Sequence, residues 1–239
     1  MNALRQLSLP FAPAPHYEAA DFVAAPSNAE ARAWLARPTS WPEGRLALSG
    51  EAGCGKTHLL HLWAAEGGGE MLAGPFLRAL PRTFARRLAV DDADACPDEA
   101  VLLHLLNATR EARCLVLLAG RTLPARWKVG LPDLTSRLRA LTAISIGPAE
   151  DALLRPLLAR LFAERQLRVS PLVQDFLLAR LPRTPAALRE AAARLDRRAL
   201  ASGGRISRPL AALVIAELGG EVEPAPAMPQ VEFDRALSI

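Results

Sequence analysis

Residues 50–57 are the feature that most constrains how this chain folds. They read Gly-Glu-Ala-Gly-Cys-Gly-Lys-Thr and fit the phosphate-binding pattern G-x-x-x-x-G-K-[ST] at every position. The apolar run 45–48 before them predicts a strand, and residues 58–64 after them predict the start of a helix. Glycines in such a strand-loop-helix unit let backbone N–H groups surround an anion, and the helix N-terminus adds partial positive charge. The pattern therefore predicts a phosphate site within an α/β fold.

The loop contains the residue types that a nucleotide and its metal ion require. Lys56 is expected to reach the terminal phosphates, and Thr57 is expected to ligate magnesium. ADP or ATP with Mg²⁺ is the cofactor that this chemistry implies. The alternative is a pattern match with no function. The expected nucleotide-binding residues of this segment are Gly50, Gly53, Cys54, Gly55, Lys56, Thr57 and His58.

A second apolar run, residues 87–90, ends in the acids Asp91 and Asp92. Carboxylates at a strand end near a phosphate loop are placed to hold the magnesium shell and to orient water. We assign Asp91 to the metal, together with Thr57, and Asp92 to the catalytic water. The alternative is that these acids are turn residues, which are common at strand ends.

Predicted strands and helices alternate as far as residue 147. After the acids, residues 97–113 predict a helix, and the runs 114–119 and 143–146 predict buried strands. Alternation with short connections favours a parallel sheet with helices on both faces. A nucleotide is then expected outside the carboxyl ends of the strands.

From residue 147 onward the pattern is wholly helical. Ser170 and Thr184 each precede a proline, which is a strong signal for a helix start. Pro156 predicts a kink in the first helix or a later start. The expected helices cover about residues 150–166, 171–181, 185–202 and 208–218. The expected division is an arm at 1–20, an α/β domain at 21–147, a helical lid at 148–218 and a loose tail at 219–239.

The composition indicates a cytoplasmic protein without a membrane span or disulfides. No stretch of 18 or more residues lacks charge, and the N-terminus has no basic and apolar signal segment. The three cysteines show neither C-x-x-C nor zinc spacing. The net charge of +4 is uneven, with 12 arginines against 6 acidic residues between Asp151 and Leu218. This half fits an anionic partner, and a solvated arginine face on amphipathic helices is the alternative.

The arm, residues 1–20, is rich in proline and alanine and predicts an unfolded segment. Residues 6–11 within it, Gln-Leu-Ser-Leu-Pro-Phe, suit an extended peptide whose apolar side chains enter pockets of a partner. This spelling resembles the short motif with which bacterial replication proteins dock onto the sliding clamp of the DNA polymerase. The alternative is that the segment folds back onto its own domain. By the resemblance, the clamp-binding residues would be Gln6, Leu7, Leu9 and Phe11.

Two further segments resemble replication proteins. Residues 22–28 read F-V-x-x-x-S-N, and residues 131–138 read L-P-D-L-x-S-R-L. The first resembles the entry segment of the bacterial initiator DnaA, and the second resembles the Hda family of DnaA-related regulators of replication initiation. The resemblance implies an α/β AAA+ P-loop domain, with a parallel sheet flanked by helices, followed by a small all-helical lid. Within the first segment, Ser27 and Glu30 predict a capping box for a helix through residues 33–35.

The resemblance also assigns roles to three residues. Phe22 and Val23 would line the adenine pocket, whereas periodicity alone makes them core residues. Arg137 would be presented across a subunit interface to the nucleotide of a neighbour, a contact that suits the planar, permanently charged guanidinium. Without the resemblance, Arg137 reads as a surface arginine.

Departures from the family pattern lower the expected ATPase activity. The family places a phosphate-sensing polar residue after the strand that here ends at Ala119, where Arg121 follows. It places an arginine at the position of Ala186, where Arg183 and Arg189 are nearby. The interval between the phosphate loop and the acids is short for an AAA+ core, which predicts an abbreviated strand or helix. We therefore expect weak or no intrinsic ATP hydrolysis and retained binding of ADP or ATP.

The resemblance implies a negative regulator of chromosomal replication initiation. The arm would hold the chain on the DNA-loaded clamp while Arg137 completes the active site of ATP-bound DnaA and promotes hydrolysis. No segment after the lid resembles the DNA-binding helix-turn-helix domain of DnaA, so DNA contact is expected mainly through the clamp. No membrane contact is expected, and a homo-oligomer is compatible with the pattern. Two alternatives are an autonomous AAA+ ATPase, such as a loader or remodelling motor, and a non-enzymatic ADP-bound adaptor.

Overall fold

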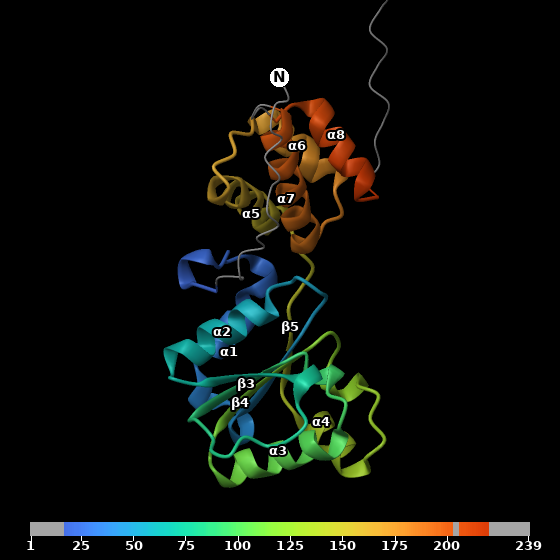
Figure 1. The fold of residues 1–239 in the computed structure, drawn as a ribbon. Coiled ribbons are helices and arrows are strands. Elements are labelled where there is room, and N and C mark those ends of the chain that lie inside the picture. Colours follow the sequence, from blue (N-terminus) through green and yellow to red (C-terminus); the bar gives the residue numbers. More distant parts are fainter. Residues whose placement is uncertain (1–16, 203–205, 220–239) are drawn as a thin grey trace, which may run out of the picture.

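Five parallel strands form the centre of the fold (Figure 1). The structure is a computed structural model that describes residues 17–202 and 206–219. The strands lie in the order β2-β3-β4-β1-β5, and parallel pairing joins each neighbouring pair. Their bounds are β1 (Arg45–Ser49), β2 (Glu70–Ala73), β3 (Arg87–Asp91), β4 (Leu115–Gly120) and β5 (Ala143–Ser145). In this order β1 lies between β4 and β5, so the phosphate loop that follows it opens at the carboxyl ends of the strands, one strand in from β5.

Helices cover both faces of the sheet because its strands are apolar on both sides. Leu46 and Leu48 pack on the face that carries α1 (Ala29–Leu35) and α2 (Lys56–Glu66). Ala47, between them, packs on the opposite face among residues of α3 (Glu99–Glu111) and α4 (Pro132–Ala140). Side chains alternate across a strand, so such a run must be covered twice. The predicted parallel sheet flanked by helices is therefore confirmed.

The connection between β2 and β3 contains no α-helix. Its regular structure is the 3₁₀ turn η5 (Gly74–Phe76), and the rest runs irregularly to Arg87. This abbreviation explains the short interval between the phosphate loop and Asp91. The other 3₁₀ turns are η1 (Ala19–Asp21), η2 (Pro26–Asn28), η3 (Pro38–Ser40), η4 (Pro42–Gly44), η6 (Ala93–Ala95) and η7 (Pro124–Arg126).

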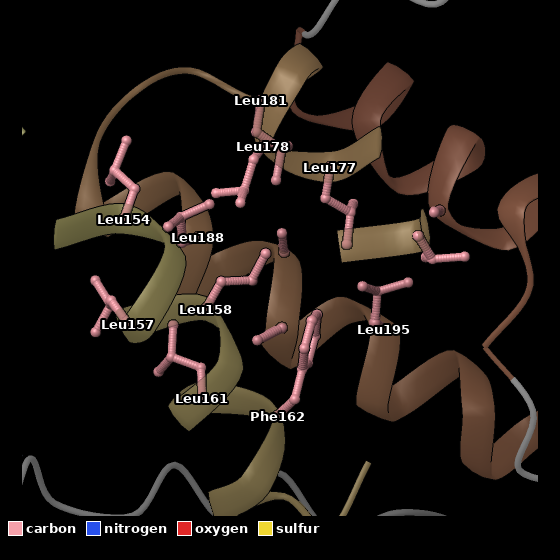
Figure 2. Close-up of a cluster of buried hydrophobic side chains, with 14 of the residues drawn as sticks. Leu154, Leu157, Leu158, Leu161, Phe162, Leu177, Leu178, Leu181, Leu188 and Leu195 are labelled. Atoms are coloured by element: carbon pink, nitrogen blue, oxygen red, sulfur yellow. The ribbon is translucent and has the colours of Figure 1, made fainter. Parts of the chain in front are cut away.

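Four helices follow the sheet and enclose a separate hydrophobic core. They are α5 (Asp151–Glu164), α6 (Pro171–Arg180), α7 (Pro185–Ser202) and α8 (Arg208–Glu217). Figure 2 shows Leu158 and Phe162 of α5 pointing toward leucines of α6 and α7 in this core. The first helix starts at Asp151 and runs through Pro156, so of the two expected effects of this proline, a kink or a later start, the later start is wrong. We call these four helices the lid, which lies beyond the edge of the sheet where the phosphate loop opens (Figure 1).

Only one of the two predicted serine and threonine caps makes its hydrogen bond. The hydroxyl of Thr184 accepts from the backbone N–H of Ala187 at 3.2 Å, whereas Ser170 makes no side-chain cap bond. We expect Thr184→Ala to lower the free energy of unfolding by about 1 kcal/mol, because that N–H loses its partner. Urea unfolding measures this change. Ser170→Ala is the matched control and should leave stability nearly unchanged; equal losses in both variants would contradict the assignment.

The predicted capping box at Ser27 is wrong. The Ser27 hydroxyl is buried and has no hydrogen-bond partner among the described residues. Asn28 stabilises this bend instead, since its side-chain oxygen accepts from the N–H of Ala25 at 3.1 Å and its amide donates to the carbonyl of Val23 at 3.0 Å. The backbone N–H of Gly147 donates to the carbonyl of Ser27 at 2.9 Å. The segment before α1 is therefore tied to the connection between β5 and the lid.

Candidate functional site

The phosphate loop joins the end of β1 to the first turn of α2. Gly53 and Gly55 have φ of 81° and 104°, a backbone region that other residues rarely adopt. A side chain on Gly53 would also lie 3.3 Å from Cβ of Ala186, the second residue of α7. Glycine is therefore required at Gly53 both by its backbone conformation and by the close approach of the lid.

Lys56 and Thr57 are held in place by the loop and by β3. Lys56 is 6% exposed, and its ammonium donates to the carbonyls of Gly50 at 2.7 Å and Glu51 at 3.0 Å. The Thr57 hydroxyl donates to a carboxylate oxygen of Asp91 at 2.6 Å. The second oxygen of Asp91 accepts from the next backbone N–H at 3.1 Å. A hydroxyl and a carboxylate in contact are oxygen ligands of the kind that Mg²⁺ takes.

A cleft of about 820 Å³ opens between the phosphate loop and the lid. This volume is within the range of small-molecule and cofactor sites. Leu157 and Leu161 of α5 give it an apolar wall, opposite the charged loop. Of the residues that the sequence assigns to the nucleotide, its metal or catalysis, those that line the cleft are Gly53, Gly55, Lys56, Thr57, His58 and Asp92. Asp92, which has a φ of 46°, adds a carboxylate near the Thr57–Asp91 pair.

The residues given such roles that do not line this cleft are Phe22, Val23, Gly50, Cys54, Asp91 and Arg137. Gly50 and Cys54 border a second cavity on the other side of the loop. The ring of Phe22 contacts that of His58 edge-on, with centroids 5.3 Å apart, and Val23 packs against the lid core. The side chains of Phe22 and Val23 are thus packed, as the periodicity predicts, and the assignment of the backbone around them to the adenine pocket is still a prediction.

Residues 17–21 pack over α2 instead of extending away as an arm. Tyr17 stacks on His61, with centroids 4.1 Å apart, and lines the cleft. His58 donates from Nε2 to the carbonyl of Glu18 at 2.9 Å, and burial lowers the pKa of His58. On the lid side, Arg160 forms an ion pair with Asp21. Residues 17–20 thus differ from the unfolded arm expected at 1–20, because the stacking of Tyr17 and the hydrogen bond to the Glu18 carbonyl hold them on α2.

Two arginines that no local pattern placed in the site line the same cleft. Arg121 follows β4, and Arg189 projects from α7. Burial lowers the pKa of Arg189, which indicates a guanidinium withdrawn from water. Ala119 is fully buried in the sheet, and Ala186 packs on Gly53, so neither can contact a phosphate through a polar group. The positive charge therefore comes from Arg121, two residues after Ala119, and from Arg189, three residues after Ala186.

Arg137 lies at the other end of the sheet. It is near the C-terminal end of α4, which leads into the start of β5, whereas the phosphate loop follows the end of β1 (Figure 1). Arg137 does not line the cleft, and within residues 17–202 and 206–219 its side chain has no ion-pair or hydrogen-bond partner. Burial lowers the pKa of Arg45, the first residue of β1, and the charge of Arg137 adds to this effect. Arg137 therefore cannot serve the nucleotide cleft of its own chain.

Solved structures share this arrangement of sheet and lid. Domain III of the replication initiation protein DnaA of Thermotoga maritima aligns with 86% of this chain and 98% of its own length, at 17% identity and a TM-score of 0.72. The chain has an AAA+ fold. DnaA bound to AMPPCP and single-stranded DNA aligns at 16% identity and a TM-score of 0.59. The RuvB Holliday junction branch migration motor of Thermotoga maritima aligns at 18% identity and a TM-score of 0.56.

The extent of these matches limits what they establish. The alignments cover 75% of this chain and 64% of the nucleotide-bound DnaA, and 73% of this chain and 61% of RuvB. The chain thus spans less than two thirds of these two longer proteins. No family model matches the sequence, and no match was found among curated proteins. The predicted AAA+ architecture is confirmed, and membership of the Hda family is still a prediction.

Proposed function

We propose that the cleft between the phosphate loop and the lid binds ADP or ATP with Mg²⁺. Lys56, Arg121 and Arg189 supply positive charge for the phosphates, and the apolar wall of α5 suits the base. Thr57 and Asp91 would hold the ion, which neutralises phosphate charge when bound. The described residues contain no group of three or more histidine, cysteine or acidic side chains that could hold a metal ion by themselves. Magnesium is therefore expected to enter with the phosphates.

The chain then acts as a regulator of replication initiation that completes the active site of DnaA. The observation that carries this proposal is the place of Arg137, a guanidinium without an acidic partner in the described chain, at the end of the sheet opposite its own phosphate loop. An arginine supplied in trans stabilises the charge of a transferring phosphoryl group and accelerates the reaction by roughly 10³ to 10⁵. Hydrolysis in the partner would end its competence to initiate replication.

The N-terminal segment would hold the regulator on the DNA polymerase sliding clamp. Gln6, Leu7, Leu9 and Phe11 lie outside the described residues, so this step rests on the motif alone. Tyr17, which lies six positions after Phe11 in the sequence, packs on α2 and lines the nucleotide cleft. Clamp and DnaA would thus be bound by opposite parts of one small protein. The described part of the chain has no helix long and apolar enough to cross a membrane.

Purified chain together with clamp loaded on DNA should raise the rate of ATP hydrolysis by DnaA. Replacing Leu9 and Phe11 by alanine should abolish retention on a clamp column, because both apolar anchors of the extended peptide are lost. Without clamp retention, the stimulation of DnaA ATP hydrolysis should also fall, while the binding of ADP to the variant is unchanged. Replacing Leu172 and Leu213, two exposed leucines of the lid, by alanine removes apolar surface outside the motif and should change neither result. Undiminished clamp retention of the Leu9 and Phe11 variant would exclude this tether.

An autonomous ATPase is the second candidate. The contact between Thr57 and Asp91, with Asp92 at the cleft, favours it, because these groups suit magnesium binding and water positioning within one chain. Robust ATP turnover by the purified chain alone, together with ring formation, would support this candidate. Turnover only in the presence of DnaA and the clamp would support the regulator.

A further inference from the structure

A second cavity, of about 420 Å³, lies on the far side of the phosphate loop. Its walls come from the loop itself, the segment after β4, the segment after β5, and the turn between α6 and α7. These segments meet only in the folded chain, so no single stretch of sequence indicates the cavity. Its size suits a small ligand rather than a helix or strand of another protein.

Positive side chains outnumber acidic ones in the lining of this second cavity. Arg121, Arg126 and Arg183 border it, against one lining carboxylate, Glu51. Within residues 17–202 and 206–219, neither Arg121 nor Arg126 forms a side-chain ion pair, whereas Arg183 pairs with Asp151 at 2.8 Å. Two of the three arginines that border this space thus have no acidic side-chain partner among these residues.

Hydroxyl groups add neutral hydrogen-bonding capacity to the same cavity. The hydroxyls of Ser49 and Ser145 lie 3.0 Å apart at the ends of β1 and β5, and both residues line the cavity. Each hydroxyl has one donor and two acceptor positions, so their mutual bond leaves further capacity. Guanidinium forks with nearby hydroxyls match the oxygens of a phosphate group in geometry and charge.

The cavity is separate from the nucleotide cleft. Close packing of Ala186 against Gly53 brings α7 onto the loop between the two spaces. The two linings share only Ala52 and Arg121. The base and the phosphates of a nucleotide held by Lys56 would therefore leave Arg126 and Arg183 uncontacted.

We propose that this cavity binds a small phosphorylated molecule that carries at least two phosphate groups. With two or more phosphates, the arginines of the segment after β4 and the arginine of the α6–α7 turn can each engage a phosphate group of their own. Because Arg121 borders both spaces, a ligand here competes with the nucleotide for one guanidinium. Binding at either site should weaken binding at the other by the same factor, as thermodynamic linkage requires. This coupling rests on the proposed nucleotide binding, whereas the anion site itself does not.

Calorimetric titration of the full chain with inorganic pyrophosphate tests the proposal. With the phosphate loop filled by saturating ADP, one pyrophosphate should still bind per chain. Replacing both Arg126 and Arg183 by alanine should weaken that binding by about 100-fold, since each lost charge-assisted hydrogen bond contributes about tenfold or more. The same variant should keep its ADP affinity, because neither arginine lines the nucleotide cleft.

The control removes the same charge elsewhere. Arg139 and Arg168 are exposed and line neither cavity, so their replacement by alanine should leave pyrophosphate binding unchanged. Equal pyrophosphate affinity in the Arg126 and Arg183 variant and in the parent would overturn the proposal. So would binding of a hexaglutamate peptide in place of pyrophosphate. If the chain does not bind ADP at all, the proposed function is excluded. The comparison of pyrophosphate affinity between the parent and the Arg126 and Arg183 variant still tests the anion site.

Discussion

The variant Arg137→Ala should lose the stimulation of DnaA ATP hydrolysis, with a fall of about 10³-fold, the lower end for an arginine supplied in trans. Its guanidinium is separated from the chain's own cleft by the length of the sheet, so the variant should bind ADP as the parent does. Clamp binding should also be unchanged. The effect is measured as single-turnover ATP hydrolysis by DnaA in the presence of clamp loaded on DNA. Increasing amounts of the parent or of the Arg137→Ala variant are added.

Two matched variants separate a phosphate contact from a general charge effect. Arg139, exposed on the same helix, should tolerate alanine with little loss of stimulation. Arg137→Lys keeps the charge but loses the planar fork, and should restore only a small part of the rate. Full stimulation by Arg137→Ala would exclude the proposed role of this residue.

Loss of Arg137 should not damage the fold. Arg45 is 4% exposed and close enough for the charge of Arg137 to act on it. Arg45 keeps its own partners, a hydrogen bond to the carbonyl of Leu106 and an ion pair with Glu43 at 3.8 Å. Removing Arg137 takes away one like charge and no described hydrogen bond. A reduced ATPase stimulation with an unchanged melting temperature would therefore report on function alone.

The sheet and the phosphate loop were predictable because their signals are local. The apolar run before the loop became β1, and the run 114–119 became β4 (Leu115–Gly120) with a shift of one residue at each end. The central strands β1 and β4 are buried along almost their whole length and need apolar residues on both faces, and this requirement is visible in a few adjacent residues of the sequence. The helix starts after Ser170 and Thr184 were visible for the same reason, since proline at the first helical position is a local signal.

The cleft was only partly predictable because the lid and residues 17–21 build much of its wall. Tyr17, Arg160 and Arg189 are brought to the phosphate loop from positions far apart in the sequence. Nothing in the local pattern distinguishes Arg189 from the other arginines of α7. The capping box failed for a related reason, since the Ser27 hydroxyl is buried by tertiary packing while Asn28 makes the local bonds. Burial and partners distant in the sequence determine which residues line the cleft and which side chain caps the bend. The pattern of a single sequence contains neither kind of information.

The variant Lys56→Ala should weaken ADP binding by about 100-fold. In the structure its ammonium is 6% exposed and bonded to two loop carbonyls, so it is held inside the curve where phosphates would bind. Charge-assisted hydrogen bonds to a phosphate contribute about 1.5–3 kcal/mol each, and one or two of them account for the expected loss. Since ligand binding stabilises the folded state, saturating ADP should raise the melting temperature of the parent and not that of the variant.

Lys128, exposed and outside both cavities, provides the control, because it is the only other lysine of the chain. Its replacement by alanine should leave the ADP-induced stabilisation intact. The same pair of variants also distinguishes the regulator from a structural adaptor. If nucleotide shapes the face that meets DnaA, Lys56→Ala should lose ATPase stimulation although Arg137 is still present. Full stimulation by a folded, nucleotide-free Lys56→Ala protein would mean that the phosphate loop stabilises the domain and that Arg137 works without it.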